Sequence, residues 1–259
     1  MISWIPGLTN LLQQRLSSMG EKAVVAAPAE GGCAESIAHP LHTILVLTSS
    51  LWWAYGSASR ARVAHDAVNP NRIFLYGRTV VFELLLLALV IAGVRWHGSP
   101  IQAVLGERWR SARAVMSDLG VGLAFWLVAL IVTSALGSVL EPGGNNRAVQ
   151  FLMPLGRAEM ALWVLLSLTA GICEEAVYRG YLQRQLGAWT RSVPAGIVLS
   201  AVAFGGVHLY QGWHRAAVIW VGGVMGGLLA YWRKSVRPGM VAHAWQDAMA
   251  PVLMRLIKH

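Results

Sequence analysis

Charged residues are scarce in this chain of 259 residues. Asp, Glu, Lys and Arg together make up 13%, about half of the ~25% that is usual in soluble domains, and so few charges could not cover a soluble surface of this size. Hydrophobic residues make up 56%, which excludes a disordered chain, because disorder needs low hydrophobicity and high net charge. The composition therefore predicts an integral membrane protein.

Cysteine and acidic residues are also few. The two cysteines, Cys33 and Cys173, lie far apart, which excludes a disulfide framework and a cysteine zinc site. The net charge is +9, from 21 Lys and Arg against 12 Asp and Glu. In a membrane protein such an excess places basic residues in loops beside anionic headgroups. We therefore expect the lipid bilayer as a partner and no nucleic acid. The N-terminus lacks a basic stretch followed at once by an apolar one, so we also expect no cleaved signal peptide.

Apolar runs near the length of a membrane helix, about 20 residues, recur along the chain. We expect an all-α, polytopic transmembrane helix bundle of about seven spans, with six and eight as bounds. The expected spans are 41–57, 73–94, 119–140, 159–190, 193–209, 215–232 and 238–257. The fourth is one long helix that leaves the hydrocarbon after Cys173 as an amphipathic extension. Glu141-Pro-Gly-Gly-Asn-Asn breaks the chain before it.

Ionisable residues inside spans are functional candidates, because charge in hydrocarbon is costly. Arg78 and Glu83 lie in the second span, and we expect them near a helix end or facing protein. The other candidates fall in the C-terminal half, in three short strings. Lys and Arg are more numerous on the side of the N-terminus, which predicts a cytoplasmic N-terminus.

The first string is Glu174-Glu175-Ala-Val-Tyr-Arg179. On a helix Glu175 and Arg179 are four residues apart and can pair, whereas Glu174 points about 100° away and can face a cavity. Pairing would neutralise one carboxylate and leave Glu174 for proton transfer. A helix that leaves the membrane with solvated charges is the alternative interpretation of this string alone.

The second string is Phe204-Gly-Gly-Val-His208, whose glycines permit the close approach of a helix or an extended substrate. The third is His243-Ala-Trp-Gln-Asp247, in which Asp247 can orient or charge His243 from the same helix face. Each histidine could instead be a hydrogen-bonded structural residue of the bundle.

Spacing brings the first two strings together. Spans four and five should be antiparallel with a turn near 188–193, so Glu174 and His208 both lie roughly 25 Å from the turn. They can therefore meet at one depth. His243 reaches that depth only if the section 181–189 projects beyond the membrane.

A buried glutamate with two histidines supports two chemistries. Glu174, His208 and His243 could hold a divalent metal such as zinc. Alternatively, Glu174 could activate water directly as a general base, with one histidine sharing the proton and the other, with Asp247, stabilising an oxyanion. No His-Glu-x-x-His zinc helix is present, so we favour the glutamate scheme and predict no cofactor firmly.

In this order and on successive helices, the three strings resemble the signature of the CPBP family of intramembrane proteases, also called the CAAX-protease or Abi family. That signature is Glu-Glu-x-x-x-Arg, then Phe-x-x-x-His, then His-x-x-x-Asn or Asp, and the resemblance covers about residues 155–257. It implies hydrolysis of a peptide bond in a membrane-associated protein or peptide. The roles that it implies are water activation by Glu174 with help from His208, oxyanion stabilisation by His243 and Asp247, and positioning by Glu175 and Arg179.

The third string departs from one part of the family. Prenyl-processing members typically end it in Asn, where this chain has Asp247. An ionised Asp accepts hydrogen bonds but cannot donate one to an oxyanion. Orienting His243 is the alternative role for this residue.

With this resemblance the chain divides into an amphipathic or linker segment (1–38), accessory transmembrane helices (39–150) and a catalytic core (151–259). Two other functions are compatible with the same residues: a non-catalytic membrane scaffold or immunity protein, and a small proton-coupled transporter. No internal repeat of the kind that many transporters have is present. We expect a multi-pass protein of a bacterial or archaeal inner (cell) membrane.

Overall fold

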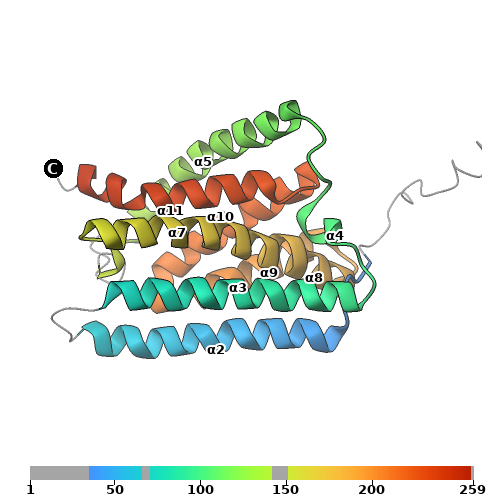
Figure 1. Cartoon of the computed structure of the whole chain (residues 1–259), viewed down its shortest axis with the longest axis horizontal. Helices are drawn as coiled ribbons and strands as arrows, with labels where there is room; N and C mark the ends of the chain where they lie inside the picture. Colours follow the sequence, from blue (N-terminus) through green and yellow to red (C-terminus); the bar gives the residue numbers. More distant parts are fainter. Residues whose placement is uncertain (1–34, 66–70, 142–150, 258–259) are drawn as a thin grey trace, which may run out of the picture. The chain divides into compact units, whose positions relative to one another are not determined.

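The computed structural model describes residues 35–65, 71–141 and 151–257. In these ranges every regular element is helical, and β-type pairing is limited to an isolated bridge between Gly106 and Ser235 (Figure 1). The expected all-α class is therefore confirmed. Most of the predicted segment 1–38, Cys33 included, and most of the predicted breaker after Glu141 lie outside the described residues.

Each of the seven predicted spans coincides with a helix. The N-terminal half contains α2 (Pro40–His65), α3 (Arg72–Trp96), the short α4 (Gln102–Leu105) and α5 (Ala112–Leu140). The C-terminal half contains α7 (Arg157–Glu174), η1 (Glu175–Leu182), α8 (Gln183–Thr190), α9 (Val193–Val207), η2 (Leu209–Gln211), α10 (Trp213–Arg233) and α11 (Arg237–Ile257).

Four helices in the described ranges are long and apolar enough to cross a membrane. They are Arg72–Trp96, Ala112–Leu140, Arg157–Thr190 and Trp213–Arg233, and Val193–Val207 is apolar but shorter. This number is smaller than the seven spans expected. The helices α2 and α11 are not among the four. In α11 the polar side chains of His243, Gln246 and Asp247 line an internal cavity, so its composition is less apolar than that of a helix surrounded by lipid.

The exposed surface of α5 indicates the surroundings of the bundle. This helix buries only Asp118 and Gly122, and its apolar residues Leu127, Ile131 and Val139 are 52%, 69% and 73% exposed. A long helix with an exposed apolar surface needs an apolar environment. The hydrocarbon of a bilayer provides one.

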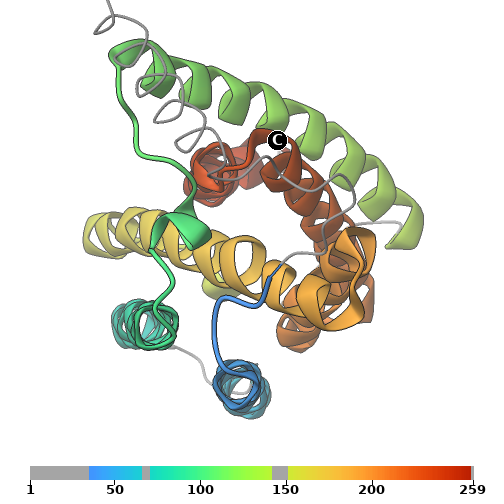
Figure 2. The same cartoon turned by 90° about the vertical axis from the view of Figure 1, so that its right-hand side faces the viewer.

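Helix α7 lies at the centre of the helix packing. It packs against α3 on one side and α11 on the other, and α2 packs beside α3 (Figure 1). Helix α5 packs on α10 and α11 at the edge of the bundle (Figure 2). Gly171 permits the close contact of α7 with α11, because a Cβ atom there would lie 2.7 Å from the backbone nitrogen of Ala244.

The predicted long helix is continuous from α7 through η1 to α8. It ends at Arg191, whose φ of 51° is left-handed, and the Ser192 hydroxyl caps α9 by accepting from the backbone N–H of Ala195. The predicted turn is thus confirmed. The second half of the helix is not a solvated extension, however. All eight residues of η1 are buried, because α4, α9 and α10 pack around them.

Candidate active site

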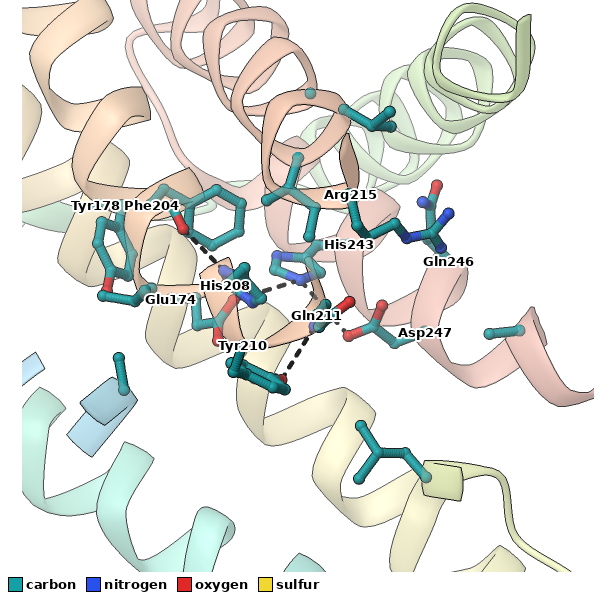
Figure 3. Close-up of a pocket in the computed structure, with 18 of the residues that line it drawn as sticks. Glu174, Tyr178, Phe204, His208, Tyr210, Gln211, Arg215, His243, Gln246 and Asp247 are labelled. Carbon is teal, nitrogen blue, oxygen red and sulfur yellow. Dashed lines mark hydrogen bonds and ion pairs between the residues drawn. The ribbon is translucent and has the colours of Figure 1, made fainter. Parts of the chain in front are cut away.

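A cavity of about 1980 Å³ lies inside the bundle, and side chains from both halves of the chain line it. The six residues singled out in the three strings all line it: Glu174, Glu175, Arg179, His208, His243 and Asp247. Figure 3 shows Glu174, His208, His243 and Asp247 around the cavity. Small-molecule pockets usually measure about 300–1,000 Å³. This cavity can therefore hold a larger ligand, such as an extended peptide or a lipid chain.

A change of helix type separates the two adjacent glutamates. Glu174 is the last residue of α7, and Glu175 begins the π-helical segment η1. Segments of π-helix inside α-helices occur frequently at functional sites. The side chain of Glu174 is 15% exposed and that of Glu175 only 4%, so the two carboxyl groups occupy different environments.

Glu175 forms the predicted pair with Arg179. Its Oε1 lies 3.1 Å from Nη1 of Arg179, and both side chains are buried. The guanidinium also lies over the ring of Phe204, 4.1 Å from its centroid, a cation–π contact. The buried ion pair thereby joins the first string to the second.

His243 is surrounded by three carboxyl groups. Its Nδ1 lies 3.2 Å from Oε1 of Glu175, while its Nε2 lies 3.5 Å from Oε2 of Glu174 and 3.5 Å from Oδ2 of Asp247 (Figure 3). The contact with Asp247 follows from the four-residue spacing. The contact with Glu175 does not, because 68 residues separate the two.

His208 lies at the end of α9, where its ring is fixed by the backbone. Its Nδ1 is 2.8 Å from the carbonyl oxygen of Phe204. Since a carbonyl only accepts, Nδ1 carries the hydrogen, and Nε2 of the neutral ring then has a free lone pair. We assign this tautomer from the hydrogen bond.

Tyr210 lies beside this histidine. Its ring stacks on that of His208 with the centroids 6.1 Å apart (Figure 3). Burial is the main cause that raises the pKa of Tyr210 to about 12. Its hydroxyl therefore keeps its hydrogen at neutral pH and can serve as a donor in the cavity. The sequence analysis did not identify this residue.

The two charged residues inside the predicted second span face protein, as expected. Arg78 and Glu83 both line the cavity, and the Arg78 guanidinium lies over the ring of Trp53, 4.9 Å from its centroid. Glu83 is 6% exposed, and its Oε2 is buried without a hydrogen-bond partner among the described residues. The sequence analysis left Glu83 without a role.

The metal alternative requires Glu174, His208 and His243 to share one ion. In the described ranges no group of three or more His, Cys, Asp and Glu side chains is arranged to hold a metal ion. Glu174 and His243 approach each other, but the contacts of His208 are with Phe204 and Tyr210. The mechanism proposed below therefore uses only side chains of this chain.

Comparison with known proteins gives a match for the C-terminal part of the chain. Residues 156–249 match the family described as type II CAAX prenyl endopeptidase Rce1-like, and this range contains all three strings. No curated protein and no solved structure matches the chain. The family match and the apolar helices together indicate an integral membrane protein. The resemblance of the three strings to the CPBP, or CAAX protease, family is thus confirmed over the Rce1-like region of residues 156–249.

Proposed function

We propose that this protein is an intramembrane endopeptidase that hydrolyses a peptide bond in a membrane-associated protein or peptide. The observation that carries the proposal is the pair formed by Glu174 and His243, which face each other across 3.5 Å inside a large cavity. Both residues belong to the Rce1-like region. The matched family implies a protease, and CAAX proteases act on membrane-associated proteins.

In the proposed reaction, Glu174 takes a proton from a water molecule while the water oxygen adds to the scissile carbonyl carbon. His208 holds this water, because its Nε2 can accept a hydrogen bond. The proton then passes from Glu174 to the leaving nitrogen as the C–N bond breaks. The products are a carboxylic acid and an amine, and the proton of the acid passes to the amine to give a carboxylate and an ammonium group.

His243 suits the stabilisation of the developing oxyanion. Carboxylates only accept hydrogen bonds, so carboxylate contacts at both ring nitrogens correspond to a doubly protonated ring. Its Nε2–H can then donate to the oxyanion of the tetrahedral intermediate. The hydrogen bond to Glu175 at Nδ1 holds the ring, and Arg179 holds Glu175.

Asp247 fits a supporting role better than direct donation. Its side chain is 39% exposed and contacts Nε2 of His243. As an ionised carboxylate it stabilises the charged ring but offers no hydrogen of its own. We therefore assign it to orienting and charging His243, the alternative that the sequence left open.

The lining of the cavity supports a substrate with an apolar part. Aromatic side chains from α2, α5 and α7 contribute to it, namely Trp53, Phe125, Trp126 and Trp163. Together with the volume of about 1980 Å³, this lining suits a lipid chain attached to a peptide. A prenylated peptide is therefore the probe that we choose.

The test is cleavage of a farnesylated, fluorescence-quenched CAAX peptide by the purified protein in liposomes. The wild-type protein should cleave the peptide, and Glu174→Ala should lower kcat by about 10²-fold or more, the range expected for loss of a general base. Glu107→Gln is the matched control, because the Glu107 side chain is 82% exposed and does not line the cavity.

The three proteins should have the same melting temperature, which would show that activity is lost through the chemistry and not through unfolding. Full activity in Glu174→Ala would disprove the assigned role. Binding of the peptide by wild-type protein without any cleaved product would instead favour a non-catalytic scaffold.

A further inference from the structure

The π-helical segment η1 is an unusual conformation for the part of the chain that carries Glu175 and Arg179. A π-helix is rare and occurs mostly as a single turn inside an α-helix, whereas η1 is eight residues long. In a π-helix each carbonyl accepts from the fifth residue along and not from the fourth, and here the N–H of Gln183 donates to the carbonyl oxygen of Tyr178. A contact from outside the helix is therefore expected to favour this arrangement over the ordinary α-helix.

Ser200 of α9 makes such a contact. Its hydroxyl donates a hydrogen bond of 2.6 Å to the same carbonyl oxygen of Tyr178, and the residue is 2% exposed. In the described part of the chain, no other side chain forms a hydrogen bond with the backbone of η1. A side chain that inserts into the hydrogen-bond ladder of a helix changes the local helix geometry. The hydroxyl of Ser200 therefore favours the π-helical turn at Tyr178.

Ser200 shares a helix face with two residues of the second string. Ser200, Phe204 and His208 follow one another at four-residue intervals, so they lie along one face of α9. The ring of Phe204 packs against that of Tyr178, with the centroids 5.0 Å apart (Figure 3). These contacts, together with the hydrogen bond of Ser200, fix the position of α9 along η1. The position of His208 at the end of α9 follows from it.

The turn at Tyr178 also affects the residues that hold His243. Glu175 lies three residues before Tyr178, and Arg179 lies directly after it. Oε1 of Glu175 lies 3.2 Å from Nδ1 of His243 and 3.1 Å from Nη1 of Arg179. A return of η1 to an α-helix would turn both of these side chains about the helix axis relative to Glu174. Glu175 would then move away from His243.

We propose that Ser200 is a positioning residue, whose hydroxyl holds the π-helical turn at Tyr178. This turn sets the relative positions of Glu174, His208 and His243. Ser200 is not among the residues that line the cavity, so it acts through the helix and not through contact with the substrate. The inference rests on the function proposed above, in which Glu174 activates water.

Ser167→Ala is the matched control for Ser200→Ala. Ser167 is 1% exposed, does not line the cavity, and donates a hydrogen bond of 2.8 Å to the carbonyl oxygen of Trp163 in its own helix. In the farnesyl-peptide assay, Ser200→Ala should lower kcat by about tenfold with KM unchanged, because loss of positioning acts on the reacting geometry. Ser167→Ala should keep the wild-type kcat.

The ring of His243 provides a measurement that does not need catalysis. In protein labelled with ¹⁵N-histidine, the ring nitrogen resonances of His243 are identified by their absence in His243→Gln. These resonances should shift in Ser200→Ala and stay unchanged in Ser167→Ala. Each variant loses one buried hydrogen bond, so the two should have similar melting temperatures. If wild-type protein does not cleave the peptide, the proposed function fails, and the resonances still decide whether Ser200 positions the site.

Three results would overturn the inference. The first is an equal kcat in Ser200→Ala and Ser167→Ala. The second is a set of His243 resonances in Ser200→Ala that coincides with the wild-type set, because the hydroxyl would then have no influence on the site. The third is a loss of folding confined to Ser200→Ala, which would make the role of this residue structural.

Discussion

Gly239→Ala should impair catalysis through a single added methyl group. A Cβ atom at position 239 would lie 2.7 Å from Oε2 of Glu175, so the carboxylate must move by about 0.7 Å before an ordinary contact distance is reached. A shift of that size away from the ring takes the 3.2 Å contact with His243 Nδ1 beyond the range of a hydrogen bond.

The expected result follows from the effect of misplacement on rate. A displacement of 1 Å can lower a rate by about 10²-fold, so a shift of about 0.7 Å should lower kcat by more than about tenfold. Stability should change little, because Ala favours the helix by up to about 1 kcal/mol over Gly, which offsets the new contact. The cleavage assay and thermal unfolding measure the two effects separately.

Gly120→Ala is the matched control, since it makes the same change in a helix where nothing lies within 4 Å of the added atom. It should leave kcat at the wild-type value. Wild-type kcat in Gly239→Ala would refute the reasoning, because the position of Glu175 would then not influence His243.

Two further predictions concern packing and metal. Gly171→Val should lower the melting temperature by several degrees, because its Cβ would lie 2.7 Å from Ala244 and overpacking costs about 1–3 kcal/mol. An equal loss in Gly120→Val would show that the contact with α11 is not the cause. Chelators should leave peptide cleavage unchanged, since the described residues form no three-ligand group. If a chelator abolished cleavage and added zinc restored it, Glu174, His208 and His243 would instead be metal ligands.

Local geometry explains which parts of the site were predictable. The pair of Glu175 with Arg179 follows from the four-residue spacing of a helix and is present at 3.1 Å. The antiparallel turn at Arg191 and Ser192 likewise follows from the break between two apolar runs. These features depend on neighbours in the sequence, so a single sequence is sufficient to infer them.

Features that depend on distant residues were not predictable. The π-helical segment η1 begins between the two adjacent glutamates, and no residue pattern in this string predicts a π-helix. His243 has a hydrogen-bond partner in Glu175, 68 residues away, whereas helical spacing predicted only Asp247 as its neighbour. The burial of η1 was also not predicted, because its charged residues are equally typical of a helix end exposed to solvent.

By itself the sequence determined the class of protein, the positions of the helices and the three strings that carry the site. Composition and helical spacing are sufficient for these, because burial in lipid and contacts within one helix depend on local residues. The tertiary structure alone decided which carboxyl group faces which nitrogen of His243: Glu174 faces Nε2, and Glu175 faces Nδ1. The packing of α11 against α7 sets those contacts, and close approach at small residues such as Gly171 permits it.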